Sequence, residues 1–186
     1  MLNTLTFQPD SATLSQIKYL PSPFCDARPP NTSIDMVVIH GISLPRGEFG
    51  SDAIQQFFCG ELDYSHHPSF AQIQTLKVSA HLFIKRTGEI LQFVPFDKRA
   101  WHAGESEFAG RKNCNDFSIG IELEGCDFIP YDVNQYVQLA KTIKLLMQIY
   151  KDISLDRIVG HVDIAPGRKT DPGPLFDWDY LKGQLR

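Results

Sequence analysis

Apolar and polar residues along the chain follow patterns that predict short strands separated by helices. The run 34–40 is rich in β-branched residues and predicts a buried strand. In the segment 118–124 apolar and polar positions alternate, which predicts a strand with Glu122 and Glu124 on the face opposite the apolar one. The run 157–161 predicts a third short strand.

Helical spacing is clearest at 134–150, where an apolar residue returns every three or four positions. The stripe consists of Tyr136, Leu139, Ile143, Leu146 and Tyr150. Ser51 is a candidate cap for a short helix that Gly60 ends, and 176–185 predicts a closing helix. A single helical turn is expected near 70–74.

Glycine and proline mark the connections between these elements. The runs 78–86 and 90–94 flank Thr87 and Gly88 and predict a β-hairpin, whereas 162–174 reads as a loop. Helices interleaved with short strands predict an α/β fold with a central mixed β-sheet flanked by helices. We expect one domain over residues 1–186, with an N-terminal extension at 1–20.

The composition of the chain narrows the range of functions that a protein with this fold could have. The 186 residues suit one domain with a core of its own, and the net charge is −4. Without a run of lysine and arginine the chain is not expected to bind nucleic acid, and its longest apolar run, four residues at 36–39, predicts no membrane span. The N-terminus lacks the features of a signal peptide, so we expect a cytoplasmic protein with four free thiols.

Two of the predicted strands end in histidine, His40 and His161. Asp171 follows ten residues after His161, directly before Pro172. Two imidazoles and one carboxylate, with water in the fourth position, form a ligand set of catalytic zinc sites. Either histidine alone would more often be a structural imidazole, so the hypothesis depends on the combination.

Three further residues have both a functional and a structural interpretation. Glu122 is the candidate acid and base, although a glutamate on this face could equally be solvated. Lys169, two residues before Asp171, could oppose the charge on an oxyanion or be an ordinary loop lysine. Trp101 could form a stacking wall for a substrate or fill the core.

Several separated motifs occur together in one order. They are His40, Trp101–Gly104, the segment 115–125 and the segment 160–174. With them the chain resembles the AmpD family over residues 21–178. These are cytoplasmic 1,6-anhydro-N-acetylmuramyl-L-alanine amidases of peptidoglycan recycling, within the amidase-2 and peptidoglycan-recognition-protein fold.

The resemblance implies one Zn²⁺ ion bound by His40, His161 and Asp171. It implies that Glu122 handles the proton of the attacking water and that Lys169 stabilises the tetrahedral intermediate. The substrate would be a 1,6-anhydro-muropeptide, cut between the lactyl carbonyl of the muramic acid and L-alanine. Members of the family also lower the muropeptide signal that induces β-lactamase.

The predicted substrate-binding residues include departures from the family. Gly41 replaces an asparagine of the relatives, and Lys77 and Asn113 replace arginines. Lys77 keeps the positive charge but loses the bidentate fork of arginine, and Arg111 is a candidate substitute for the cation missing at position 113. Together with Trp101, the residues Gly41, Lys77 and Arg111 form the predicted substrate-binding set of a monomeric enzyme.

Three other functions compete with a recycling amidase. Members of this fold that lack a full zinc set bind peptidoglycan without cutting it, but Asp171, Glu122 and Lys169 are all present here. An amidase for the intact wall would require export or a wall-binding domain, and neither is expected from the sequence. A scaffold with an accidental site conflicts with the density of the motifs.

Overall fold

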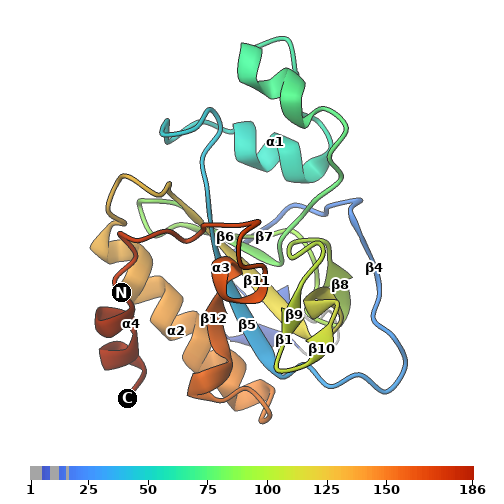
Figure 1. The fold of residues 1–186 in the computed structure, drawn as a ribbon, viewed down its shortest axis with the longest axis vertical. Helices are drawn as coiled ribbons and strands as arrows, with labels where there is room; N and C mark the ends of the chain where they lie inside the picture. The colour runs from blue at the N-terminus through green and yellow to red at the C-terminus, as the bar shows by residue number, and fades with distance from the viewer. Residues whose placement is uncertain (1–5, 9–12, 16) are drawn as a thin grey trace.

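A computed structural model describes residues 6–8, 13–15 and 17–186, and its centre is a six-stranded sheet (Figure 1). The strand order is β12-β5-β11-β6-β7-β3. These strands are β3 (Lys18–Tyr19), β5 (Met36–Ile42), β6 (Leu82–Ile84), β7 (Ile90–Gln92), β11 (Ser118–Glu124) and β12 (Ile158–Gly160). Strands β12, β5, β11 and β6 run parallel, and β7 is antiparallel to β6. The predicted mixed sheet is therefore present.

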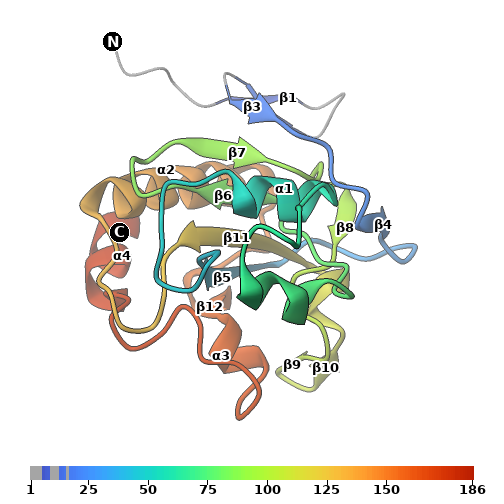
Figure 2. The same ribbon diagram turned by 90° about the horizontal axis from the view of Figure 1, so that it is seen from above.

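One face of the sheet carries the main apolar core. Helices α2 (Val133–Ile149) and α4 (Trp178–Leu185) lie side by side over this face (Figures 1 and 2). The alternation in β5 and β11 directs every second residue towards them. This core includes Val37, Ile39, Ile119, Ile121, Leu139, Ile143, Leu146 and Leu181.

The opposite face carries two further apolar clusters. Helix α1 (Ala53–Cys59) and the 3-10 helix η1 (Pro68–Ile73) contribute to a phenylalanine-rich cluster over β6 and β7. The short helix α3 (His161–Ile164) and the 3-10 helix η2 (Cys114–Asp116) contribute to a second cluster beside β5. The remaining elements are β1 (Phe7–Gln8), β2 (Thr13–Leu14), β4 (Cys25–Ala27), β8 (Lys98–Ala100), β9 (Glu107–Phe108), β10 (Arg111–Lys112) and η3 (Leu155–Arg157).

The long elements agree closely with the sequence patterns. Strand β11 has the predicted bounds, and α2 begins one residue earlier than predicted. The start of α2 is fixed by a capping box: the Asp132 carboxylate accepts from the N–H of Asn134, and the Gln135 side chain accepts from the N–H of Asp132.

Three local predictions were wrong in detail. The predicted strand 157–161 ends at Gly160, and His161 begins α3, because the Asp163 carboxylate accepts from the N–H of Gly160. The helix predicted to be capped by Ser51 begins at Ala53, and its N-cap residue makes no side-chain capping bond. The strands of the hairpin cover only 82–84 and 90–92; before them, the N–H groups of Ser79 and His81 donate to the carbonyls of Trp101 and Gly120, outside the hairpin.

The predicted N-terminal extension at 1–20 lies partly outside the described residues. Its described part forms β1, β2 and β3, and β3 pairs with β7 at the edge of the main sheet. Leu14 is buried in the core beneath α2 and α4. Within the described residues, every helix is too short or too polar to serve as a membrane span.

Candidate metal centre

Neighbouring parallel strands bring the candidate residues together at the carboxyl-terminal end of the sheet. His40 lies near the carboxyl end of β5, and Glu122 stands opposite it in register on β11. His161 directly follows β12, on the other side of β5. Asp171 arrives from the loop after α3, where its carbonyl accepts from the N–H of Val162 at 2.9 Å. The carboxyl ends of parallel strands are where α/β proteins bind their ligands.

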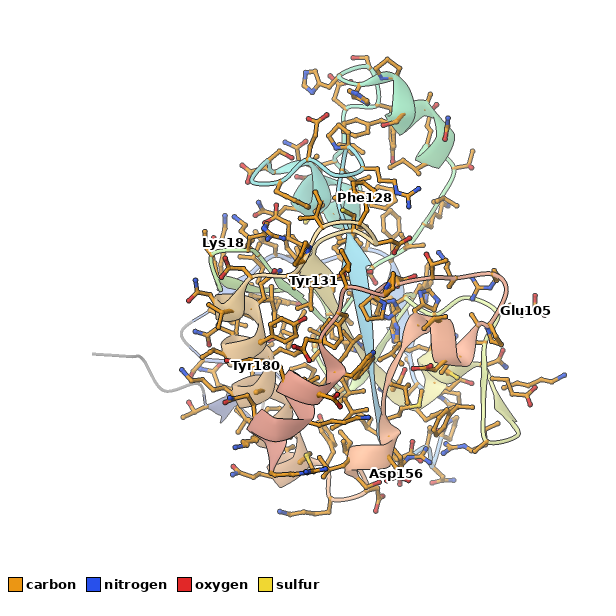
Figure 3. All side chains as sticks on the ribbon, turned by 60° about the vertical axis from the view of Figure 1, so that its left-hand side comes forward. Lys18, Glu105, Phe128, Tyr131, Asp156 and Tyr180 are labelled. Atoms are coloured by element: carbon orange, nitrogen blue, oxygen red, sulfur yellow. The ribbon has the colours of Figure 1, made fainter. Side chains whose placement is uncertain are left out.

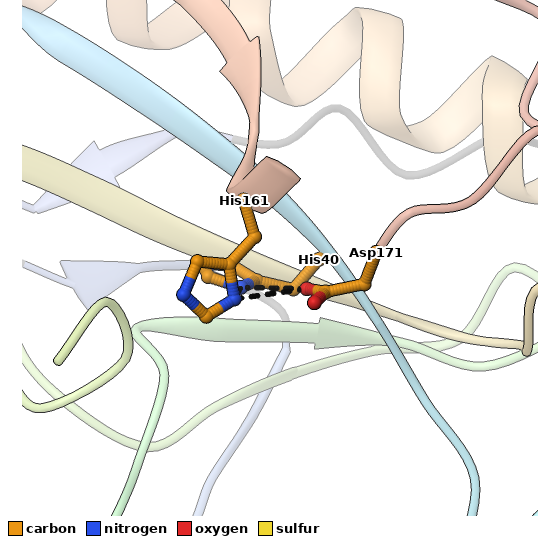
Figure 4. Close-up of side chains that lie close together, drawn as sticks. All are labelled: His40, His161 and Asp171. Carbon is orange, nitrogen blue, oxygen red and sulfur yellow. Dashed lines mark hydrogen bonds and ion pairs between the residues drawn. The ribbon is translucent and has the colours of Figure 1, made fainter. Parts of the chain in front are cut away.

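The side chains of His40, His161 and Asp171 converge on one point (Figure 4). The Nδ1 atoms of the two histidines lie 2.9 Å apart. Asp171 Oδ2 lies 3.1 Å from Nδ1 of His40 and 3.0 Å from Nδ1 of His161. Both histidines are buried, and His40 comes from a part of the chain more than a hundred residues away from His161 and Asp171. This group could hold a metal ion.

Hydrogen bonding at the far side of His161 supports a cation here. Its Nε2 lies 3.1 Å from the carbonyl oxygen of Ala103, which can only accept, so Nε2 carries the ring proton. A neutral His161 then presents a bare Nδ1 to the carboxylate of Asp171. A cation placed between this nitrogen and the carboxylate, whose atoms are 3.0 Å apart, would be bound by both. The donor set fits a metal that prefers nitrogen and oxygen ligands, as Zn²⁺ does.

Electrostatics keeps His40 in the protonation state that a metal ligand needs. Burial lowers the pKa of His40 to about 4, so its ring is neutral at pH 7. A neutral imidazole and a carboxylate are the forms that bind metals.

Glu122 lines the same hollow as His161 and Asp171. Its Oε2 is shielded from solvent and has no hydrogen-bond partner among the described residues. Burial, followed by the negative charge of Asp171, raises the pKa of Glu122 well above its usual range, and the charge of Lys169 partly opposes the shift. A carboxyl group with a raised pKa beside a candidate metal is suited to carrying protons.

The raised pKa of Glu122 predicts a pH-dependent effect on stability in chelated protein. The folded protein holds this proton more tightly than the unfolded chain, whose glutamate has a pKa of about 4.3. The stabilisation from the protonated carboxyl is complete below that value and is lost as pH rises towards the folded-state pKa. Glu122→Gln has no such loss. Its unfolding temperature relative to the natural protein should increase from pH 5 to pH 8, and a difference independent of pH would contradict this.

Two hollows meet at the converging side chains, where they share Gly41, Ile42, Lys169 and Asp171. One hollow is polar and is lined by Arg46, Asp127, Arg168 and Thr170. The other is largely apolar and is lined by Leu44, Phe57, Phe58, Ile73, Leu76 and Val78. The segment 42–77 thus supplies one wall of the groove.

The structure brings some predicted substrate-binding residues to this groove and places others elsewhere. Gly41 lines both hollows. Lys77 is exposed beside the apolar wall. Trp101 is half-buried, and its ring stacks on Phe24 at 6.4 Å between centroids. Arg111 forms an ion pair with the residue before β5, at the end of that strand away from the converging side chains.

Two buried residues beside the centre were missed by the sequence analysis. His102 contacts Nε2 of His40, the ring nitrogen away from Asp171. The Tyr131 hydroxyl donates to the carbonyl of Pro172 at 2.8 Å. Figure 3 shows Tyr131 on the inner side of the loop that carries the exposed Phe128. The Tyr131 hydroxyl occupies the space where a side chain at position 41 would begin. The motif around His102 was noticed, but no pattern indicated its contact with His40.

The four cysteines lie outside the group of converging ligand atoms, although Cys126 lines the polar hollow. Cys25, Cys59, Cys114 and Cys126 are all free thiols, as predicted, and none belongs to the metal-binding group. Cys114 and Cys126 are buried, and the other two are half-buried.

Comparison with known proteins connects this geometry to a family. The profile of N-acetylmuramoyl-L-alanine amidases (Amidase_2) matches residues 30–174. The 1,6-anhydro-N-acetylmuramyl-L-alanine amidase AmpD of Escherichia coli K12 is 56% identical over 159 residues, 86% of each chain. AmpD of Citrobacter freundii is 53% identical over 169 residues, 91% of this chain and 90% of the relative.

Solved structures agree with the sequence matches. The crystal structure of a selenomethionine derivative of AmpD superposes with a TM-score of 0.93 at 49% identity, covering 97% of this chain and 99% of the other. The amidase AmiD from E. coli, in complex with anhydro-N-acetylmuramic acid-L-Ala-D-γ-Glu-L-Lys, superposes with a TM-score of 0.62 at 31% identity, covering 84% of this chain and 60% of the other. The chain therefore belongs to the Amidase_2 family of N-acetylmuramoyl-L-alanine amidases.

Proposed function

We propose that this amidase hydrolyses the bond between 1,6-anhydro-N-acetylmuramic acid and L-alanine of muropeptides in peptidoglycan recycling. In this proposal His40, His161 and Asp171 hold one Zn²⁺ ion. The observation that carries it is the convergence of three metal-ligand atoms beside Glu122, where two hollows meet. The names of the AmpD relatives supply the substrate class.

The residues around the centre have distinct chemical tasks in this reaction. Zinc in such a site supplies Lewis acidity, which makes water a nucleophile near neutral pH. Glu122 accepts a proton from the water while the water oxygen forms a bond to the lactyl carbonyl carbon. The same carboxyl then gives the proton to the nitrogen of L-alanine as the carbon–nitrogen bond breaks. Lys169 opposes the negative charge that develops on the carbonyl oxygen.

Glu122 must be ionised when it receives the proton. The pKa of its carboxyl is raised in the metal-free protein, and a cation nearby favours the carboxylate. Lys169 already acts in this direction, and a divalent ion in the adjacent group would act more strongly. The Oε2 atom without a partner is thus free to bond to water and then to the leaving nitrogen.

The shape of the groove is compatible with a substrate that extends from the scissile bond in two directions. A muropeptide has a sugar on one side of this amide and a peptide on the other. The polar hollow with Arg46 and Arg168 and the apolar hollow with Phe57 and Leu76 meet at Lys169. AmiD, which shares the fold, has been solved with an anhydro-muropeptide as substrate.

A digestion assay tests the proposed function. Purified protein is incubated with anhydro-muropeptide or with intact sacculi, with and without a chelator, and the products are identified by mass spectrometry. We expect anhydro-N-acetylmuramic acid and a peptide that begins with L-alanine, formed only without chelator and only from the soluble substrate. Binding without cleavage would indicate a recognition module, and release from sacculi at an equal rate would indicate an amidase for the intact wall.

Other parts of the functional hypothesis come from the composition of the chain and from the resemblance to AmpD. They are a cytoplasmic location, a monomeric enzyme, the absence of nucleic-acid and membrane partners, and a decrease in the muropeptide signal that induces β-lactamase. These stay predictions. The last would follow from the proposed activity, because each hydrolysis removes one molecule of the muropeptide.

A further inference from the structure

We propose that His102 is a positioning residue for the metal centre. It connects His40 to Ser118 and to the backbone carbonyl of Cys114, and this chain of hydrogen bonds fixes the ring proton of His40 on Nε2. Nδ1 of His40 is then left bare, facing Asp171 and His161. The inference rests on the proposed function, because it assigns His102 a task in binding the metal that the proposed reaction requires.

The chain of contacts is continuous and buried. His40 Nε2 lies 2.9 Å from Nδ1 of His102. On the far side of that ring, Nε2 lies 3.2 Å from the hydroxyl of Ser118. The hydroxyl in turn lies 2.5 Å from the carbonyl oxygen of Cys114. His40, His102 and Ser118 are all buried, so bulk water does not compete for these contacts.

The direction of every bond follows from the carbonyl at the end of the chain. A carbonyl oxygen only accepts, so the Ser118 hydroxyl donates to Cys114. The oxygen of Ser118 then accepts from Nε2–H of His102. A neutral His102 has one ring proton, so its Nδ1 is an acceptor, and Nε2–H of His40 donates to it.

The position of the His102 ring is fixed from two sides. Its backbone N–H donates to the side-chain oxygen of Asn115 at 3.1 Å. The ring packs against the backbone of Gly120 so closely that a Cβ at that position would overlap it. Its plane meets the ring of His40 edge-on, at 82° with centroids 5.0 Å apart. Little rearrangement is therefore open to His102 when a metal binds.

The next residue along the chain has the same task for the other histidine. The Ala103 carbonyl accepts from Nε2 of His161, which leaves Nδ1 of His161 bare. Two adjacent residues thus orient both imidazoles with their bare nitrogens towards Asp171. Hydrogen-bond partners of metal-ligating histidines fix the tautomer and ring orientation, and their loss typically costs about 10–100-fold in metal affinity.

Two variants of nearly equal shape separate this task from simple packing. His102→Asn places an amide oxygen near the position of Nδ1, where it can accept from His40, whereas His102→Leu fills similar space without an acceptor. We expect His102→Leu to raise the zinc dissociation constant about 10–100-fold, and His102→Asn to restore most of the affinity. The measurement is a competition titration with a chelating indicator, on variants whose chelated forms unfold cooperatively.

Ser118→Ala provides a second test that leaves both rings in place. Without the hydroxyl, His102 has no acceptor for Nε2–H, and its proton can move to Nδ1. His40 would then shift its own proton to the nitrogen that faces the metal. Nitrogen-detected NMR of the histidine rings in metal-free protein should show the Nε2–H tautomer of His40 in the natural chain and a mixture in Ser118→Ala.

Specific results would overturn the inference. His102→Leu with undiminished zinc affinity would exclude the task, as would equal losses in the Asn and Leu variants with the His40 tautomer unchanged. An Nδ1–H tautomer of His40 in the natural chain would also exclude it. Zinc affinity and ring tautomers need no substrate, so failure of the proposed muropeptide hydrolysis would be recognised separately.

Discussion

Replacement of His161 by alanine is expected to remove the metal and abolish turnover. The variant deletes one of the two imidazoles, and a structural or catalytic zinc site requires at least three protein ligands. We expect zinc content to fall from about one ion per chain to near zero, measured by elemental analysis after dialysis. His66→Ala is the matched control, because His66 is exposed and lies outside the metal-binding group.

The fold itself should survive the loss of the ion. The buried core spans both faces of the six-stranded sheet and involves α1, α2 and α4, and a chain of 186 residues does not depend on one metal for its stability. Chelated natural protein should therefore unfold in a cooperative thermal transition. Undiminished zinc in His161→Ala would show that the ligand set is wrong, and a non-cooperative transition after chelation would show that the core depends on the ion.

Glu122→Gln is expected to lower kcat about 10²–10⁴-fold without loss of zinc. The amide has nearly the same shape as the carboxyl group but cannot accept the proton from water. Lys169→Met keeps most of the side-chain stem and removes its charge, and loss of one group that stabilises an oxyanion commonly costs about 10²–10³-fold in kcat. Steady-state kinetics with anhydro-muropeptide and metal analysis of the same samples provide the measurements.

Control variants distinguish the loss of a catalytic group from a general effect of removing a charge on kcat. Lys141→Met removes an exposed lysine from α2, away from both hollows, and should leave kcat unchanged. The double variant of Glu122 and Lys169 should lose less than the product of the single losses, because both groups serve one transition state. Full kcat in Glu122→Gln would exclude its acid–base task. Loss of zinc in either single variant would require a different coordination shell.

Periodicity predicted the elements that are long and amphipathic. Strand β11 alternates over seven residues, and α2 repeats its apolar positions over four turns, so local sequence carries enough information to locate both. Strands such as β4 and β8 have three residues each, and they exist because they pair with each other across 73 positions of sequence. No local pattern encodes such a pairing.

The convergence of His40, His161 and Asp171 was predictable for a different reason. His40 and His161 each stand at the carboxyl end of a predicted strand, and parallel strands bring those ends together. Arg111, which is predicted to bind substrate, forms an ion pair with Asp35, and no local pattern indicated that pairing. The contact of His102 with His40 depends on the space above Gly120, which only the assembled sheet creates.

The long separation of the ligands in sequence has a consequence for the biosynthesis of the enzyme. His40 is made early, but His161 and Asp171 follow only after most of the 186 residues have been joined. Before that point a nascent chain has a single histidine of the group, which cannot hold an ion firmly. Metal capture is therefore a late event in the life of each molecule, and a product truncated before Asp171 would remain unloaded.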